Sequence, residues 1–147
     1  MKKINGFTLV ELLVSLAVLA VLSTMAAPLF VTMLKKQNMN NSVQELKILF
    51  SEARGKAVLE RRDITVKLNS NSINTVSELN WHPSGKAVLK TGTSPSSIVF
   101  LMNGTINSVS DLNYEICDDV VSNAKYSKKI GITRMGVIQM ITEGTCS

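Results

Sequence analysis

The sequence has few of the residues from which catalytic and metal-binding sites are built. Its 147 residues include one histidine and two cysteines, too few for a His/Cys zinc site or a Cys–His nucleophile pair. With 8 glycines and 3 prolines, it is neither collagen-like nor of low complexity. Charged residues make up only 18% and apolar residues 45%, the opposite of a disordered chain. The length allows one folded domain of ordinary size and little more.

The apolar residues are concentrated near the N-terminus. Residues 12–31 carry no charge, and a helix of that length spans about 30 Å, the thickness of a bilayer core. A secretory signal peptide fits poorly, because the run is about twice as long as a usual signal and no small-x-small cleavage site leads into a polar stretch. Lys2 and Lys3 precede the run, so this end should stay cytoplasmic. Glu11 is the one charge between residues 7 and 34, and an intramembrane charge usually marks function.

The first residues are similar to a known targeting signal. The segment from Lys2 to Leu13, KKINGFTLVELL, resembles the class III signal of type IV pilins and pseudopilins. The resemblance implies that a membrane prepilin peptidase cuts after Gly6 and methylates the new amine of Phe7. It also implies that Glu11 helps to place the subunit in a filament. Since a carboxylate in lipid is poorly solvated, the Phe7 amine of a neighbouring subunit would neutralise it, and this pairing would select the axial register.

A single long helix is expected to continue beyond the membrane segment. Pro28 lies inside the apolar run and predicts a kink, because proline removes one helical hydrogen bond. Beyond Lys36, apolar residues recur with helical spacing on one face and charges occupy the others. This stripe predicts a core-facing side and consists of Val43, Leu46, Phe50, Ala53 and Ala57. The helix should end at residues 61–63.

The rest of the chain has the short β-branched runs and frequent turns of β structure. Asn103-Gly104 predicts a type I′ hairpin, and residues 134–136 predict a second turn. The sequence thus predicts an α+β fold, with a long N-terminal helix packed on small antiparallel β-sheets. The expected strands are residues 64–68, 86–90, 98–102, 105–109, 114–117, 130–133 and 137–142. The expected division is a leader at 1–6, a transmembrane and assembly half-helix at 7–34, an amphipathic half-helix at 35–63, and a periplasmic β domain at 64–147.

A narrower resemblance concerns the region beyond the membrane. The helix end at residues 53–62 and the following strand are similar to the FimT/FimU/GspH group of minor pseudopilins, as are Trp81 and Cys117-Asp118. The resemblance implies a long helix on two small sheets and, often, a C-terminal disulfide. A Cys117–Cys146 bridge would close 28 intervening residues and stabilise the small domain by about 3–4 kcal/mol in an oxidising compartment. Two free thiols are the alternative.

The resemblance implies a structural function. The chain would be a minor pseudopilin that is incorporated into a type IV pilus and helps to prime it, and a type II secretion pseudopilin is the close variant. Its partners would be the prepilin peptidase, other major and minor pilins, and the inner-membrane assembly platform. It would cross the bacterial inner membrane once, with its C-terminal domain in the periplasm, before entering a pilus or pseudopilus.

DNA binding during natural transformation is a second hypothesis. Some FimT-like pilins carry a Gly-Arg-x-Arg pattern in the C-terminal hairpin, whereas residues 136–139 here are Gly-Val-Ile-Gln. A basic cluster that could contact phosphates remains nearby, although acidic residues just before it favour a solvated charged face. The cluster consists of Lys125, Lys128, Lys129 and Arg134.

The sequence offers little for an enzyme. His82 has no evident nucleophile or metal-binding partner, and Asp118-Asp119 lacks the spaced carboxylates of a calcium loop. We therefore expect no catalysis, no metal and no cofactor.

Overall fold

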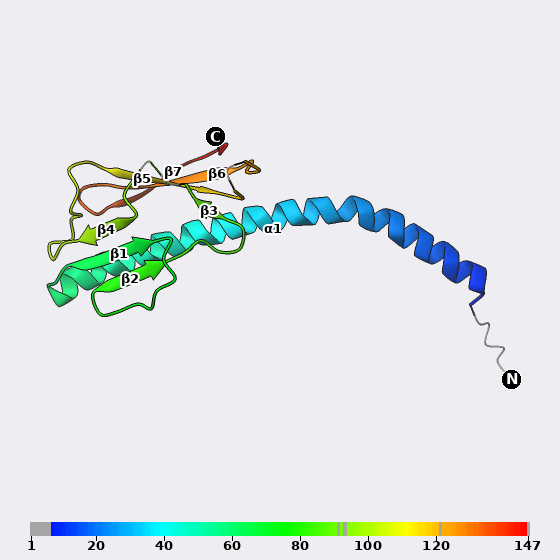
Figure 1. Ribbon diagram of the computed structural model, residues 1–147, viewed down its shortest axis with the longest axis horizontal. Helices are drawn as coiled ribbons and strands as arrows, with labels where there is room; N and C mark the ends of the chain where they lie inside the picture. Colours follow the sequence, from blue (N-terminus) through cyan, green and yellow to red (C-terminus); the bar gives the residue numbers. More distant parts are fainter. Residues whose placement is uncertain (1–6, 91, 93, 121, 147) are drawn as a thin grey trace. The chain divides into compact units, whose positions relative to one another are not determined.

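The computed structural model describes residues 7–90, 92, 94–120 and 122–146, without the side chains of residues 25, 140 and 141. Gly6, the expected cleavage residue, lies outside these ranges. One helix, α1, runs from Leu9–Glu60 and is followed by seven strands in the described part of the chain (Figure 1). The chain divides into two compact units, Met1–Leu34 and Lys35–Ser147.

The first unit contains the apolar part of α1. This part is long and apolar enough to cross a membrane, and every described side chain from Phe7 to Leu34 is exposed. The α-helix continues without interruption through Pro28. Hydroxyl groups in this segment donate hydrogen bonds to backbone carbonyls three or four residues earlier, which satisfies them without water. These residues are Ser15, Ser23, Thr24 and Thr32.

The second unit packs the remainder of α1 against two sheets, which lie along the cyan-to-green part of the helix (Figure 1). The first sheet has the order β2-β1-β4 and the second the order β3-β5-β6-β7. All pairs are antiparallel except β1 with β2, which is parallel. The strands are β1 (Ile64–Leu68), β2 (Glu78–Trp81), β3 (Val88–Leu89), β4 (Ser97–Phe100), β5 (Leu112–Cys117), β6 (Ser127–Ile132) and β7 (Ile138–Gly144).

The predicted apolar stripe of α1 forms the core. All five of its residues are buried, with exposed fractions of 0–1%. Phe50 contacts an aromatic ring from each sheet: its centroid lies 6.1 Å from that of Phe100 on β4 and 6.0 Å from that of Tyr114 on β5. The Tyr114 hydroxyl donates to the Pro95 carbonyl at 3.0 Å, and burial raises its pKa. The stripe thus joins both sheets through one helix.

The predicted Asn103-Gly104 hairpin is wrong in its turn type and its second strand. A type I′ turn needs positive φ at both central residues, but of these two only Gly104 has one, at 80°. The Gly104 N–H donates to the Leu101 carbonyl, and the Leu101 N–H donates to the Thr105 carbonyl. Gly104 therefore occupies the left-handed position that follows a type I turn. The expected strand 105–109 is reduced to a single bridge between Phe100 and Ile106.

The β6–β7 turn has the same design. Gly136 N–H donates to the Thr133 carbonyl and Thr133 N–H to Val137, and Gly136 has φ 71°. The two turns touch, since Ile106 N–H donates to the Arg134 carbonyl at 3.0 Å. The Arg54 Nε of α1 donates to the Gly104 carbonyl at 3.1 Å. This contact ties the two sheets and the helix together at one end of the second unit.

Candidate functional site

The first candidate site is the start of α1. Thr8 is its N-cap: the Thr8 Oγ1 accepts the Glu11 N–H at 3.2 Å, and the Thr8 hydroxyl donates to Glu11 Oε2 at 3.5 Å. This is the spacing of a capping box, in which a hydroxyl residue and an acidic residue three positions later provide hydrogen-bond partners for the free backbone N–H groups of the first turn. The Glu11 carboxylate is thereby held at the positive end of the helix dipole. Phe7, directly before the cap, is 81% exposed.

This arrangement gives Glu11 a local role that the sequence analysis missed. The signal was present as Thr8-x-x-Glu11 in front of an apolar run. The cap fixes the carboxylate relative to the helix start, while both residues stay exposed. A carboxylate placed in this way can accept an amine from another molecule without rearrangement of the first turn. The two partners needed for the predicted pairing, Phe7 and Glu11, therefore both lie at one helix end.

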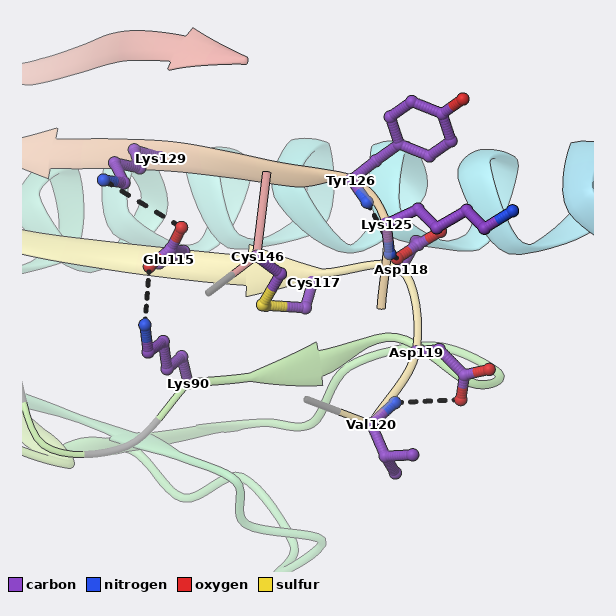
Figure 2. Close-up of a disulfide and its surroundings, with 10 residues drawn as sticks. All are labelled: Lys90, Glu115, Cys117, Asp118, Asp119, Val120, Lys125, Tyr126, Lys129 and Cys146. Carbon is purple, nitrogen blue, oxygen red and sulfur yellow. Dashed lines mark hydrogen bonds and ion pairs between the residues drawn. A yellow bond between two sulfur atoms is a disulfide. The ribbon is translucent and has the colours of Figure 1, made fainter. Parts of the chain in front are cut away.

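The second candidate site is the disulfide end of the second sheet (Figure 2). Cys117, the last residue of β5, is bonded to Cys146 beyond β7, with the Cα atoms 5.8 Å apart. Cys117 is fully buried. The predicted bridge is confirmed, and it links the C-terminal segment to a strand that does not neighbour β7 in the sheet.

Two aspartates next to the bridge organise the loop between β5 and β6 rather than a metal site. Asp118 Oδ1 accepts the backbone N–H groups of Lys125 at 2.9 Å and Tyr126 at 3.1 Å. Asp119 pairs with Lys35 of α1, with Oδ2 and Nζ 2.7 Å apart, and accepts the Val120 N–H at 2.8 Å. The hydrogen bond from Lys35, followed by that from Val120, lowers the pKa of Asp119. In the described part of the chain, no group of three or more His, Cys, Asp or Glu residues could hold a metal ion.

Two members of the predicted basic cluster have acidic neighbours. Lys129 and Glu115 are cross-strand partners, with Nζ and Oε1 3.9 Å apart, and Lys90 approaches the same carboxylate at 3.4 Å (Figure 2). Lys128 pairs with Glu143 at 2.9 Å. Lys128 and Lys129 line one small pocket together with Thr142 and Glu143, but each of the two cations has an acidic neighbour that offsets its charge.

The other two members of the cluster lie at opposite ends of β6. Lys125 precedes that strand and Arg134 follows it. Both side chains are exposed. The backbone N–H of Arg134 is bound by the Asp111 carboxylate at 2.9 Å. The four cations are thus spread along one strand and partly neutralised by acidic neighbours.

His82 is exposed, and its Nδ1 lies 2.9 Å from the carbonyl oxygen of Pro83. Trp81, the residue before it, is buried in the core as part of β2.

Comparison with known proteins gives two findings. Residues 1–27 match the family model of the prokaryotic N-terminal methylation motif. The fold is similar to two crystal structures of the type IV minor pilin FimU from Pseudomonas aeruginosa strain PAO1, in space groups P21 and P65. The P21 form has a TM-score of 0.53 and 17% identity over 76% of this chain and 97% of that one. The P65 form has a TM-score of 0.50 and 19% identity over 74% and 99%. No curated protein sequence matches.

The chain therefore carries the methylation motif of type IV pilins at its start, and it is similar in fold to the minor pilin FimU. Its long helix on small sheets is the pilin fold of FimU, as predicted. The methylation motif of this pilin-like chain covers Gly6, Phe7 and Glu11.

Proposed function

We propose that the chain is a minor pilin that is incorporated into a type IV pilus and helps to prime its assembly. The observation that carries the proposal is the methylation motif at residues 1–27, placed directly at the start of a helix with a bilayer-length apolar segment. The FimU-like fold of the second unit supports a pilus role. The subunit acts by packing against other pilins and performs no chemistry of its own.

Processing precedes assembly. Prepilin peptidase removes residues 1–6 by cutting between Gly6 and Phe7, and methylates the new amine. The apolar half-helix holds the subunit in the inner membrane until the assembly platform transfers it to the filament, where Pro28 allows the helix to bend. The Cys117–Cys146 bridge supports a periplasmic location for the second unit, because disulfides persist in oxidising compartments.

Glu11 selects the register of the incoming subunit. Its carboxylate accepts the Phe7 amine of a neighbour, and in a low-dielectric surrounding an unpaired carboxylate is costly. The Thr8 cap supports this role, since it holds the carboxylate at the helix start where a neighbour's first residue can reach it. A subunit in the wrong register leaves both charges unpaired.

Two variants of the full chain test processing and assembly separately. Gly6→Ala should retain the leader, seen as a larger band on immunoblots of membrane fractions. Glu11→Ala should be cleaved normally but restore few pili to a strain that lacks the gene. Glu11→Asp, which keeps the charge, is the matched control and should restore more. Normal cleavage of Gly6→Ala, or full piliation by Glu11→Ala, would refute the respective role.

The same deletion strain separates the alternatives. Loss of surface pili with normal type II secretion supports the proposal, and the reverse result indicates a secretion pseudopilin. DNA uptake is the weaker alternative, because Lys128 and Lys129 are paired with Glu143 and Glu115. If DNA is bound, changing Lys125 and Arg134 to alanine should reduce uptake and its sensitivity to salt.

A further inference from the structure

A groove of about 530 Å³ lies between α1 and the start of β7 in the second unit. Its floor and walls combine apolar and small residues with two cations. No residue of β5 or β6 lines it, so β7 is the one described strand of its sheet that borders the groove. Its residues are Lys47, Ser51, Arg54, Gly55, Val58, Leu59, Gly136, Val137 and Ile138.

The first observation is that β7 is an unprotected edge. It is the last strand of its sheet and pairs only with β6 among the described strands. Thr133 N–H donates to Val137, and bonded pairs alternate in an antiparallel ladder. The next pair, Ile132 with Ile138, therefore directs its backbone groups outward, and the Ile138 N–H and C=O face the free edge. Such an edge is a template for another strand.

The second observation is a glycine inside α1, five residues before the helix ends, where no described residue of this chain packs against it. Gly55 lies in α1 and lines the groove. A Cβ added there would meet nothing within 4 Å. Glycine in a helix interior is unfavourable relative to alanine. The space over Gly55 is therefore room for something outside this chain.

The third observation is the charge and polarity of the walls. Lys47 and Arg54 form no ion pair with any residue that the structure describes, although Lys56 on the same helix pairs with Glu52 at 2.7 Å. Arg54 is held in place through its Nε by Gly104. Beside these cations, Leu59 is 84% exposed, Val58 47% and Val137 45%. The walls therefore complement a segment that carries both apolar and acidic side chains.

We propose that this groove receives an extended segment of a neighbouring pilin subunit, which adds a strand to the free edge of β7 and places a carboxylate against Lys47 and Arg54. Backbone bonds to the β7 edge give the contact its affinity, and alternate side chains of the added strand fill the space over Gly55 and cover Val58 and Leu59. The inference rests on the proposed function, because tethered neighbours in one filament meet at high effective concentration.

The test uses the full chain in pilus-producing cells. A photo-cross-linking amino acid, p-benzoylphenylalanine, replaces Leu59 in the groove. The control replaces Ile73, which is 89% exposed in the loop before β2. The Leu59 position should yield at least tenfold more of one adduct than the control. Peptide mapping should place that adduct on an extended, Asp- or Glu-containing segment of another protein with a methylation motif.

Two further variants separate docking from folding. Gly55→Gln fills the groove while improving helix propensity, so the unfolding temperature should rise by roughly 2–4 °C and the adduct should fall at least tenfold. Lys47→Glu should cause a similar loss of adduct, whereas Lys125→Glu, an exposed charge reversal elsewhere, should not. An unchanged adduct in Gly55→Gln, equal yields at the two probe positions, or an adduct to a second copy of this chain would overturn the inference. If Glu11→Ala still lowers piliation in that case, the proposed function stands without it.

Discussion

At the scale of single residues, Gly136 in the β6–β7 turn and Gly92 outside that turn require glycine for different reasons. Gly136 and Gly92 have positive φ values of 71° and 107°, which residues other than glycine rarely adopt. At Gly92 an added Cβ would meet nothing within 4 Å, whereas at Gly136 it would overlap the backbone carbonyl oxygen of Gly104. Backbone cannot move aside as a flexible side chain can.

Gly136→Ala should therefore destabilise the second unit by about 2–4 kcal/mol, by strain and by displacement of the neighbouring turn. Gly92→Ala carries only the conformational strain and should cost about 1 kcal/mol. Urea unfolding of the Lys35–Ser147 segment, which contains the whole buried core, measures both. Equal losses in the two variants would contradict the contact between the turns.

The end of α1 is a residue-scale feature as well. Arg61 has φ 51°, and the Arg62 N–H donates to the Ala57 carbonyl at 3.3 Å. This is the six-residue bond of a Schellman cap, in which glycine usually occupies the left-handed position. The predicted helix end at 61–63 is close, since α1 stops at Glu60.

Arg61→Gly should stabilise the unit by about 0.5–1 kcal/mol, because relief of the left-handed strain exceeds the added flexibility of the unfolded chain. Arg62, which pairs with Glu60, provides the control: Arg62→Gly should bring no gain. Urea midpoints of the same segment compare the two. A loss of stability in Arg61→Gly would show that the arginine side chain matters more than its backbone strain.

At the scale of elements, the disulfide substitutes for a sheet contact that β7 lacks. Among the described strands, β7 pairs only with β6, and its register with β6 shifts between Lys128 and Ile130. A bulge leaves one residue of the strand unpaired and locally disrupts the ladder. The bridge to Cys117 constrains the chain across β6 and β7 in the unfolded state as well.

Cys146→Ser should lower the free energy of unfolding by roughly 3–4 kcal/mol, the loop-entropy value for a closure of this length. The experiment compares urea midpoints of oxidised wild type, reduced wild type and Cys146→Ser. The last two should coincide within error. A wild type that is unaffected by reductant would mean that the bridge contributes nothing to stability.

At the scale of the whole molecule, the second unit is held partly by ion pairs between elements. In each of three pairs, a hydrogen bond from a lysine lowers the pKa of the carboxyl group that accepts it. The pairs are Lys35 with Asp119, Lys67 with Glu78, and Lys128 with Glu143. A carboxyl whose pKa is lower in the folded state contributes stability above its unfolded pKa, near 4, and loses it as the pH falls through the folded value.

The urea midpoint of the Lys35–Ser147 segment should therefore fall as the pH decreases from about 5 toward 3. Asp119→Asn should weaken this dependence, because it removes the titrating group. High salt should weaken the part that comes from the exposed Glu143 carboxylate. Lys125→Ala, at a site without an acidic partner among the described residues, serves as the control. An identical pH profile for Asp119→Asn would contradict the role of the Lys35 pair.

Much of this fold could be predicted because its determinants are local. The stripe from Val43 to Ala57 repeats with helical period and is buried as expected. β2 was missed because its four residues, Glu-Leu-Asn-Trp, show no alternation long enough to recognise, and its partner β1 lies ten residues earlier in the chain. The Asn103-Gly104 turn was misassigned because the same dipeptide fits two turn types, and only packing against Arg54 and Gly136 decides between them.

The candidate sites likewise divide into features that the local sequence indicates and features that depend on tertiary packing. The Cys117–Cys146 pair could be anticipated because only two cysteines exist. The dispersal of the basic residues could not, because the pairing of Lys129 with Glu115 depends on strand register. The groove beside β7 could not be predicted either, since it joins residues about 80 positions apart whose proximity is set by tertiary packing.

The bridge at the end of β7 has a mechanical consequence. A terminal edge strand pulled from its free end peels away one hydrogen-bonded pair at a time, at low force. Because Cys146 is bonded to Cys117, tension applied to the C-terminal end passes into β5, a strand flanked on both sides. The load is then shared by several ladders at once instead of opening β7 alone. The second unit under tension would accordingly keep its outermost strand in place.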